Sequence, residues 1–172
     1  MKHEGGFTLI EVIVALTITA LIAGGAALTT QQLLQSTQRG SDQATAIRYA
    51  QMVGYWVSND GTMSDTITIG DNPATVGETE FATMHWLEWK SGDTYEARYL
   101  WLNSSDGLQK LQRKLLVKDN NGATKSTNTS LVADHIYAAT LSQQVGGWRL
   151  TVEARSGTKS ESREYGISRR VN

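Results

Sequence analysis

Cysteine is absent from this chain of 172 residues, and proline occurs once, as Pro73. Without cysteine the fold has no disulfide and no thiol chemistry, and no thiolate can complete a zinc site. Because proline is the strongest breaker of helices, the residues that precede Pro73 can support one long, uninterrupted helix.

Neither sign of charge dominates the composition. The 16 lysines and arginines nearly balance the 17 aspartates and glutamates, which leaves a formal net charge of −1 at pH 7. This balance excludes a strongly electrostatic footprint over the whole chain. The length leaves room for one membrane segment and one modest soluble domain.

Residue patterns that carry catalysis are also missing. The histidines are His3, His85 and His135, and none stands at the spacing of a metal site. Gly24-Gly25 lies in an apolar run and Gly146-Gly147 in a turn pattern, so neither forms a phosphate-binding loop. No serine occupies a nucleophile elbow. We therefore expect a protein that is not an enzyme and uses no cofactor.

A candidate calcium cluster would consist of Asp60, Asp65 and Asp71, because Ca²⁺ prefers oxygen ligands. Their spacing does not match an EF-hand loop. We interpret these aspartates as solvated turn residues and expect no metal site.

The most informative stretch is an apolar run from Phe7 to Leu28 that contains one charged residue, Glu11. A helix of this length spans roughly 30 Å, the thickness of the hydrocarbon layer of a bilayer. Lys2 and His3 precede the run, and the next basic residue is Arg39, so the charge distribution predicts a cytoplasmic N-terminus.

A secretory signal peptide is the alternative interpretation of this run, since small residues near its end could imitate a cleavage site: Ala20, Ala23, Gly24 and Ala26. Glu11 argues against it. A carboxylate near the membrane centre costs about 3 kcal/mol and adds nothing to a segment that is discarded. An ionisable residue in a membrane indicates a function and a charged partner.

The heptapeptide Gly6-Phe7-Thr8-Leu9-Ile10-Glu11-Val12 resembles the signal of the type IV pilin superfamily, which includes pilins and the pseudopilins of type II secretion and competence. The resemblance implies cleavage after Gly6 by a prepilin peptidase and N-methylation of Phe7. It also implies that Phe7 and Glu11 act in filament assembly. Gly5 offers a second scissile position, but only cleavage after Gly6 makes Glu11 the fifth residue of the mature chain.

The resemblance further implies the partners and the location of the protein. The partners are other pilin or pseudopilin subunits in a helical filament, the prepilin peptidase and the inner-membrane assembly platform. The chain would cross the cytoplasmic membrane once, with its head in the periplasm or outside the cell, and would join a cell-surface filament after assembly. Many Gram-negative major pilins pin a C-terminal loop with a disulfide, so the absence of cysteine favours a minor pilin or a pseudopilin.

Four segments follow from these patterns. Residues 1–6 form the leader and residues 7–28 the transmembrane and assembly helix. Residues 29–58 continue the helix in amphipathic form and end at Asn59-Asp60-Gly61, and residues 59–172 form a β-sheet head. The apolar stripe of the continuation consists of Leu33, Gly40, Ala44, Ile47, Ala50, Val53 or Gly54, and Val57.

The head should be an antiparallel sheet, which makes the fold class α+β. The layout resembles the pilin fold, and this resemblance implies that the sheet packs on the second half of the helix. Alternation places Trp148, Leu150, Val152 and Ala154 inward. Residues 108–119 fit a strand by their flanking turns, although their leucines also fit a helix. The order of these segments is similar to that of minor pilins and J-type pseudopilins. The other predicted strands are 66–69, 81–89, 95–102, 135–145, 148–155 and 162–168.

One alternative function depends on the densest basic stretch, Lys110, Arg113, Lys114 and Lys118, close to Trp86, Trp89 and Trp101. Basic residues next to aromatic ones could make the protein a membrane-anchored binding module for DNA or a glycan. The competing interpretation is that the lysines form a solvated strand face and the tryptophans belong to the core. The near-neutral charge favours this second interpretation, so we expect no nucleic-acid partner.

Overall fold

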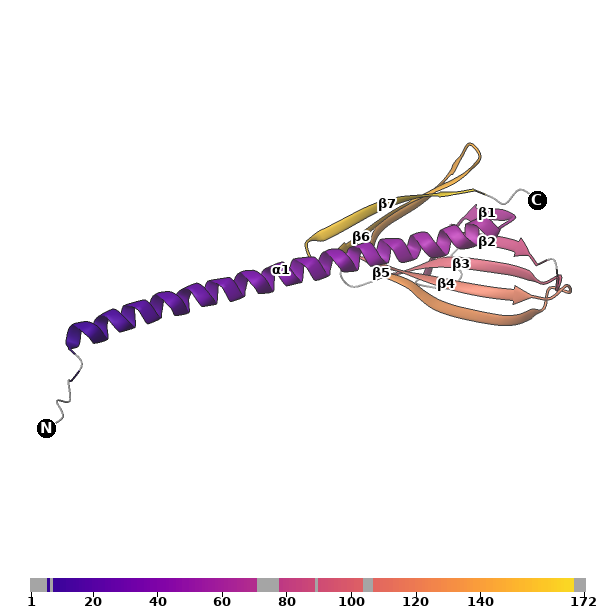
Figure 1. Ribbon diagram of the computed structural model, residues 1–172. Coiled ribbons are helices and arrows are strands. Elements are labelled where there is room, and N and C mark those ends of the chain that lie inside the picture. Colours follow the sequence, from indigo (N-terminus) through magenta and orange to yellow (C-terminus); the bar gives the residue numbers. More distant parts are fainter. Residues whose placement is uncertain (1–5, 7, 71–77, 89, 104–106, 169–172) are drawn as a thin grey trace. The chain divides into compact units, whose positions relative to one another are not determined.

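The computed structural model describes residues 6, 8–70, 78–88, 90–103 and 107–168 (Figure 1). One helix, α1 (Leu9–Met63), precedes a sheet, so the α+β prediction is confirmed. The strands are β1 (Thr66–Ile69), β2 (Glu78–Leu87), β3 (Thr94–Asn103), β4 (Gln109–Lys118), β5 (Thr124–Gln144), β6 (Gly147–Ser156) and β7 (Lys159–Ile167). The chain forms two units, Met1–Ser41 and Asp42–Asn172.

The first unit is helical from Leu9 onward, and every one of its described side chains is exposed. Its threonines direct their hydroxyl groups back to the helix: Thr17 donates to the carbonyl oxygen of Ile13 at 2.8 Å, and Thr19 to that of Ala15 at 2.8 Å. These bonds satisfy polar groups that water could not reach inside a bilayer.

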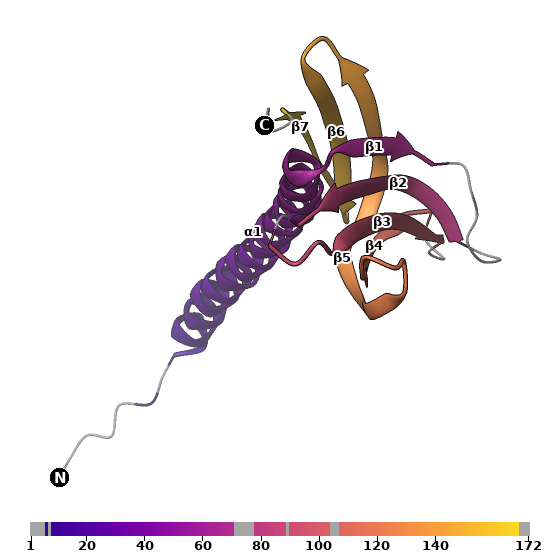
Figure 2. The same cartoon turned by 90° about the vertical axis from the view of Figure 1, so that its right-hand side faces the viewer.

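In the second unit the strands follow one another in the order β1 to β7, and each pairs antiparallel with the next. Figure 2 shows the sheet curving around the last part of α1. The core between them contains Val53 and Val57 from the helix, with Tyr99, Leu111 and Leu150 from the sheet. The alternation predicted for β6 is confirmed, because Trp148, Leu150, Val152 and Ala154 are all buried.

Glycines let the helix approach the sheet closely. A Cβ atom at Gly61 would lie 2.7 Å from Cγ2 of Ile167 in β7 and 3.6 Å from Cδ1 of Ile67 in β1. The two outermost strands therefore reach the same turn of the helix. The Tyr165 hydroxyl in β7 donates to the carbonyl oxygen of Ala50 at 3.2 Å.

The predicted end of the helix at residue 58 is wrong, because α1 continues to Met63. Asp60 is not a solvated turn residue but a fully buried one, and its carboxylate bonds to the sheet. The Ser64 hydroxyl donates to the carbonyl oxygen of Gly61 at 2.8 Å and closes the last turn. The first half of the predicted stripe is also wrong, since Leu33, Gly40 and Ala44 are exposed.

Residues 109–118 form a strand, so the helical alternative for this stretch is excluded. The strand predicted to begin at residue 135 begins instead at Thr124, so the first half of β5 is not predicted by the sequence pattern. Nearly all side chains from Thr124 to Ser130 are exposed, and so no alternation marks them. β5 pairs with β4 in its first part and with β6 in its second, and His135 between them has a positive φ of 65°.

Candidate functional site

The helix begins with a reciprocal pair of side-chain caps. The backbone N–H of Thr8 donates to Oε2 of Glu11 at 2.8 Å, and the Thr8 hydroxyl donates to the same oxygen at 2.8 Å. In return, the Glu11 N–H donates to the Thr8 hydroxyl oxygen at 3.4 Å. This capping box satisfies backbone donors that the first helical turn leaves free, and it places a carboxylate near the positive end of the helix dipole.

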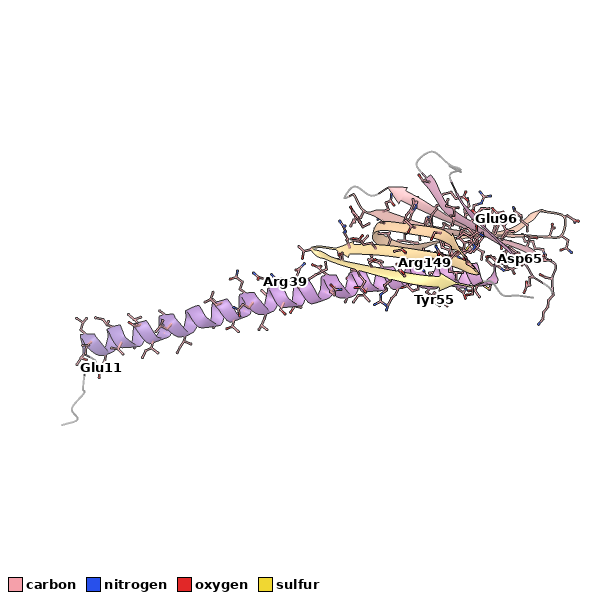
Figure 3. All side chains as sticks on the ribbon, turned by 90° about the horizontal axis from the view of Figure 1, so that it is seen from above. Glu11, Arg39, Tyr55, Asp65, Glu96 and Arg149 are labelled. Carbon is pink, nitrogen blue, oxygen red and sulfur yellow. The ribbon has the colours of Figure 1, made fainter. Side chains whose placement is uncertain are left out.

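A charged partner for Glu11 stays a prediction, and the capping bonds from Thr8 come in addition to it. Thr8 supplies two hydrogen bonds, although neither neutralises the charge. The signal was present in the sequence as Thr-x-x-Glu directly before an apolar run. Figure 3 labels Glu11 at this end of the helix.

The predicted scissile residue, Gly6, is exposed and precedes the helix. A Cβ atom there would meet nothing within 4 Å, so the described surroundings leave the backbone accessible. Phe7, the predicted methylation and assembly residue, lies outside the described residues. The geometry therefore brings together Gly6, Thr8 and Glu11 around the start of α1.

Large apolar side chains cover the helix on both sides of Glu11 and remain exposed. The group consists of Leu9, Ile10, Val12, Ile13, Val14, Leu16, Ile18, Leu21, Ile22 and Leu28. Within the described part of the chain, α1 is the one helix long and apolar enough to cross a membrane. A helix with this much exposed apolar surface needs lipid or other helices to cover it.

Residues 1–27 match the family model of the prokaryotic N-terminal methylation motif. This is the signal of type IV pilins and pseudopilins. The predicted resemblance of the first residues is thereby confirmed, and the methylation motif coincides with the capped start of the apolar helix. No curated protein and no solved structure matches the chain. The motif and the apolar helix together fit a membrane-anchored, pilin-like precursor.

The four residues of the predicted basic stretch do not form one basic surface. Arg113 is buried beneath the helix, where Nε donates to Oδ2 of Asp60 at 2.6 Å and Nη2 to Oδ1 at 2.9 Å. Lys110 pairs with Asp134 at 3.1 Å and Lys118 with Glu96 at 2.6 Å. Lys114 lies on the same strand, β4. The described Trp86 and Trp101 pack against the core, and Trp89 lies outside the described residues.

Asp60, Arg113 and Tyr99 form a buried network that fastens the end of the helix to the sheet. The Tyr99 hydroxyl donates to Oδ2 of Asp60 at 2.6 Å, and the Arg113 guanidinium lies 4.9 Å from the centre of the Trp56 ring. Burial and the Asp60 charge raise the pKa of Tyr99 well above its ordinary range. Burial alone lowers the pKa of Arg113, but the hydrogen bonds and charge of Asp60 outweigh it and raise that pKa.

The aspartate cluster considered for calcium is not assembled. Asp60 is committed to Arg113 and Tyr99, Oδ2 of Asp65 accepts the Leu87 N–H at 3.2 Å, and Asp71 lies outside the described residues. Among the residues that the structure describes, no group of three or more histidines and carboxylates could hold a metal ion. His85 lies 3.9 Å from Glu96, and His135 stacks on Tyr49.

Proposed function

We propose that this chain is a structural subunit, a minor pilin or pseudopilin, of a type IV pilus or a type II secretion pseudopilus. The observation that carries the proposal is the capped Glu11 carboxylate at the start of an exposed apolar helix, inside a matched methylation motif. A charge in that position is costly in a bilayer unless a partner of opposite charge approaches it.

Processing supplies such a partner. Cleavage after Gly6 by a prepilin peptidase, followed by N-methylation, would leave a cationic amino group on Phe7. In a helical filament this amino group would pair with Glu11 of a neighbouring subunit. Both bonds that Glu11 accepts from Thr8 end on Oε2, so Oε1 can receive the neighbour. The pair would offset the desolvation of both charges and fix the axial stagger between helices.

The cellular partners and the location follow from the same proposal. Before assembly the precursor would span the cytoplasmic membrane once, with the leader in the cytoplasm and the head in the periplasm or outside the cell. The inner-membrane assembly platform would move the processed subunit into the filament. The role is structural rather than catalytic. The DNA- or glycan-binding alternative gains no support, because Arg113 is buried and two of the lysines pair with acidic residues.

Processing can be tested by replacing the residue before the scissile bond. In Gly6→Val a branched side chain occupies the position where a peptidase must reach the backbone, so we expect the full precursor to accumulate in the membrane. Gly5→Val is the matched control and should mature normally. The measurement is the intact mass of membrane protein from the native host. An N-methylated Phe7 terminus in Gly6→Val would refute the proposed site.

A further inference from the structure

A groove of about 630 Å³ opens between the carboxyl end of α1 and strands β2, β3 and β4. Asp65, Trp86, Glu88, Lys90 and Tyr95 line its outer part, and Arg113 lies at its inner end. All of these residues belong to the unit Asp42–Asn172. Figure 3 labels Asp65 next to the end of the helix.

One wall of the groove is aromatic. The rings of Trp86 and Tyr95 stack with their centroids 5.4 Å apart and their planes 11° from parallel. Both side chains are half-buried, so their positions are fixed by the sheet while part of their surface faces solvent. Aromatic faces carry negative electrostatic potential and attract cations.

Two carboxylates stand at the mouth of the groove, and the protein holds each in place. Asp65 accepts the Leu87 N–H at 3.2 Å, and Oε2 of Glu88 accepts the hydroxyl groups of Ser91 at 3.0 Å and Tyr95 at 3.1 Å. The hydrogen bond to Glu88 raises the pKa of Tyr95, so the tyrosine remains a hydrogen-bond donor.

The end of the helix adds to this negative potential. The last turn of α1 contains no basic residue, and its final carbonyl groups carry the partial negative charge of the helix dipole. Among the described residues that line the groove, the basic ones are Lys90 and Arg113. Arg113 is already neutralised by Asp60, so of these two lining residues it is Lys90 that opposes Asp65 and Glu88.

The inner end of the groove contains a cation, Arg113, that is bound by an aromatic ring and a carboxylate. The Arg113 guanidinium lies 4.9 Å from the centre of the Trp56 ring and makes two hydrogen bonds to the Asp60 carboxylate. An aromatic face beside a carboxylate is thus how this protein holds a guanidinium internally. The mouth of the groove offers the same two kinds of group: the aromatic rings of Trp86 and Tyr95 and the carboxylates of Asp65 and Glu88.

We propose that this groove binds an arginine side chain presented by a partner protein. A planar guanidinium can stack on the aromatic wall and still direct its N–H donors to carboxylates in its plane, which a lysine ammonium cannot do as well. The site goes beyond the proposed function, because it belongs to the head and requires neither processing nor filament assembly. Its failure would leave the processing test unaffected.

The test uses the full chain in detergent micelles, labelled with 5-fluorotryptophan. The probe is Nα-acetyl-arginine amide, and its neutral isostere Nα-acetyl-citrulline amide is the matched control. Trp86→Phe assigns the ¹⁹F resonance of Trp86. We expect a saturable shift of this resonance with a Kd of roughly 1–10 mM for the arginine amide, and binding about tenfold weaker for the citrulline amide.

Variants connect the signal to the groove. The double variant Asp65→Asn, Glu88→Gln should weaken binding about tenfold, whereas Lys90→Gln should strengthen it by removing the competing charge. Glu153→Gln in β6 changes a carboxylate outside the groove and should bind like the parent. Equal responses to the two amides, or undiminished binding by the double variant, would overturn the proposal. If the double variant loses its near-ultraviolet circular dichroism, Lys90→Gln decides: unchanged or weaker binding also counts against the site.

Discussion

The ring of Tyr165 in β7 lies directly against the backbone of Gly54 in α1, so that a Cβ atom at position 54 would be 2.1 Å from its Cζ atom. Two heavy atoms that are not bonded to each other cannot approach this closely unless the neighbouring groups move apart. This contact sets the distance between the helix and the last strand, and it makes glycine a requirement at position 54.

Gly54→Ala should therefore destabilise the head, although alanine is the better helix former. Tyr165 would have to move and lose its bond to the Ala50 carbonyl oxygen, at a cost of about 1–3 kcal/mol. Gly40→Ala is the control, because a Cβ atom there meets nothing within 4 Å, and it should gain up to about 1 kcal/mol. Thermal unfolding of both variants in detergent micelles measures the difference. A neutral or stabilised Gly54→Ala would contradict the contact.

Replacements of Glu11 separate helix capping from the proposed charge pairing. Glu11→Gln keeps a side-chain oxygen that can accept the Thr8 N–H, but it loses the charge, whereas Glu11→Ala loses both. If the charge pairs with the Phe7 amino group of a neighbour, both variants should be inserted and processed yet enter filaments poorly. The measurement compares subunit content of sheared filaments with membrane content. Normal incorporation of Glu11→Gln would mean that helix capping, not charge pairing, is the function of this residue.

Arg113→Met should be among the most destabilising changes in the head, because it leaves the buried Asp60 carboxylate without its cation. Breaking a buried pair in this way costs about 3–5 kcal/mol. Arg149→Met is the control, since Arg149 and Glu164 form an exposed pair 3.9 Å apart, and it should cost at most about 1 kcal/mol. Adding Asp60→Asn to Arg113→Met should restore part of the loss. The measurement is denaturant unfolding. Equal stability of the two arginine variants would contradict the importance of the buried pair between Arg113 and Asp60.

Glu96 should make the head sensitive to acid. Burial raises its pKa, but the hydrogen bonds from Lys118 and Arg98 outweigh burial and lower it below the ordinary 4.5. A carboxyl group with a lowered pKa in the folded state stabilises the fold above its unfolded pKa. That contribution is lost as the pH falls through the folded value. Below about pH 4.5, the parent should therefore lose stability more steeply than Glu96→Gln. If the free energy of unfolding of the two proteins changed with pH in the same way, this role of Glu96 would be contradicted. The control is Glu164→Gln, which removes a carboxylate at an exposed site.

The boundary at residues 28–29 remains a prediction. A chain that begins near Thr29 should be soluble, folded and mostly monomeric, because the buried residues of α1 begin only at Ala46. Cooperative unfolding and light scattering test this expectation. Aggregation would place the boundary closer to Ser41, where the second unit begins.

Patterns within single segments predicted much of the fold. The alternation of β6, the turn at Gly146 and the apolar run after Glu11 all reflect local chemistry that a sequence displays directly. The motif at the start of the chain could be recognised for the same reason, because it depends on neighbouring residues only.

Features that depend on distant residues could not be predicted in this way. Asn59-Asp60-Gly61 contains strong stop residues, yet the helix continues because Asp60 finds Arg113 and Tyr99 far along the chain. Residues 124–130 at the start of β5 are all polar, so no apolar alternation marks them and their pairing with β4 makes them a strand. Arg113 belonged to a basic stretch by composition, but the side of β4 on which it lies decides its partner.

The order of strands in the sheet also governs how the head can form as the chain emerges during its synthesis. Because each strand pairs with its successor, every pairing can be made as soon as the next segment appears, without waiting for a distant one. The contacts between the helix and the sheet differ in this respect, and one of them, the hydrogen bond of Tyr165 to Ala50, joins residues 115 positions apart. The helix is thus held by β7 only after all other strands are in place, and the last strand to emerge completes the head.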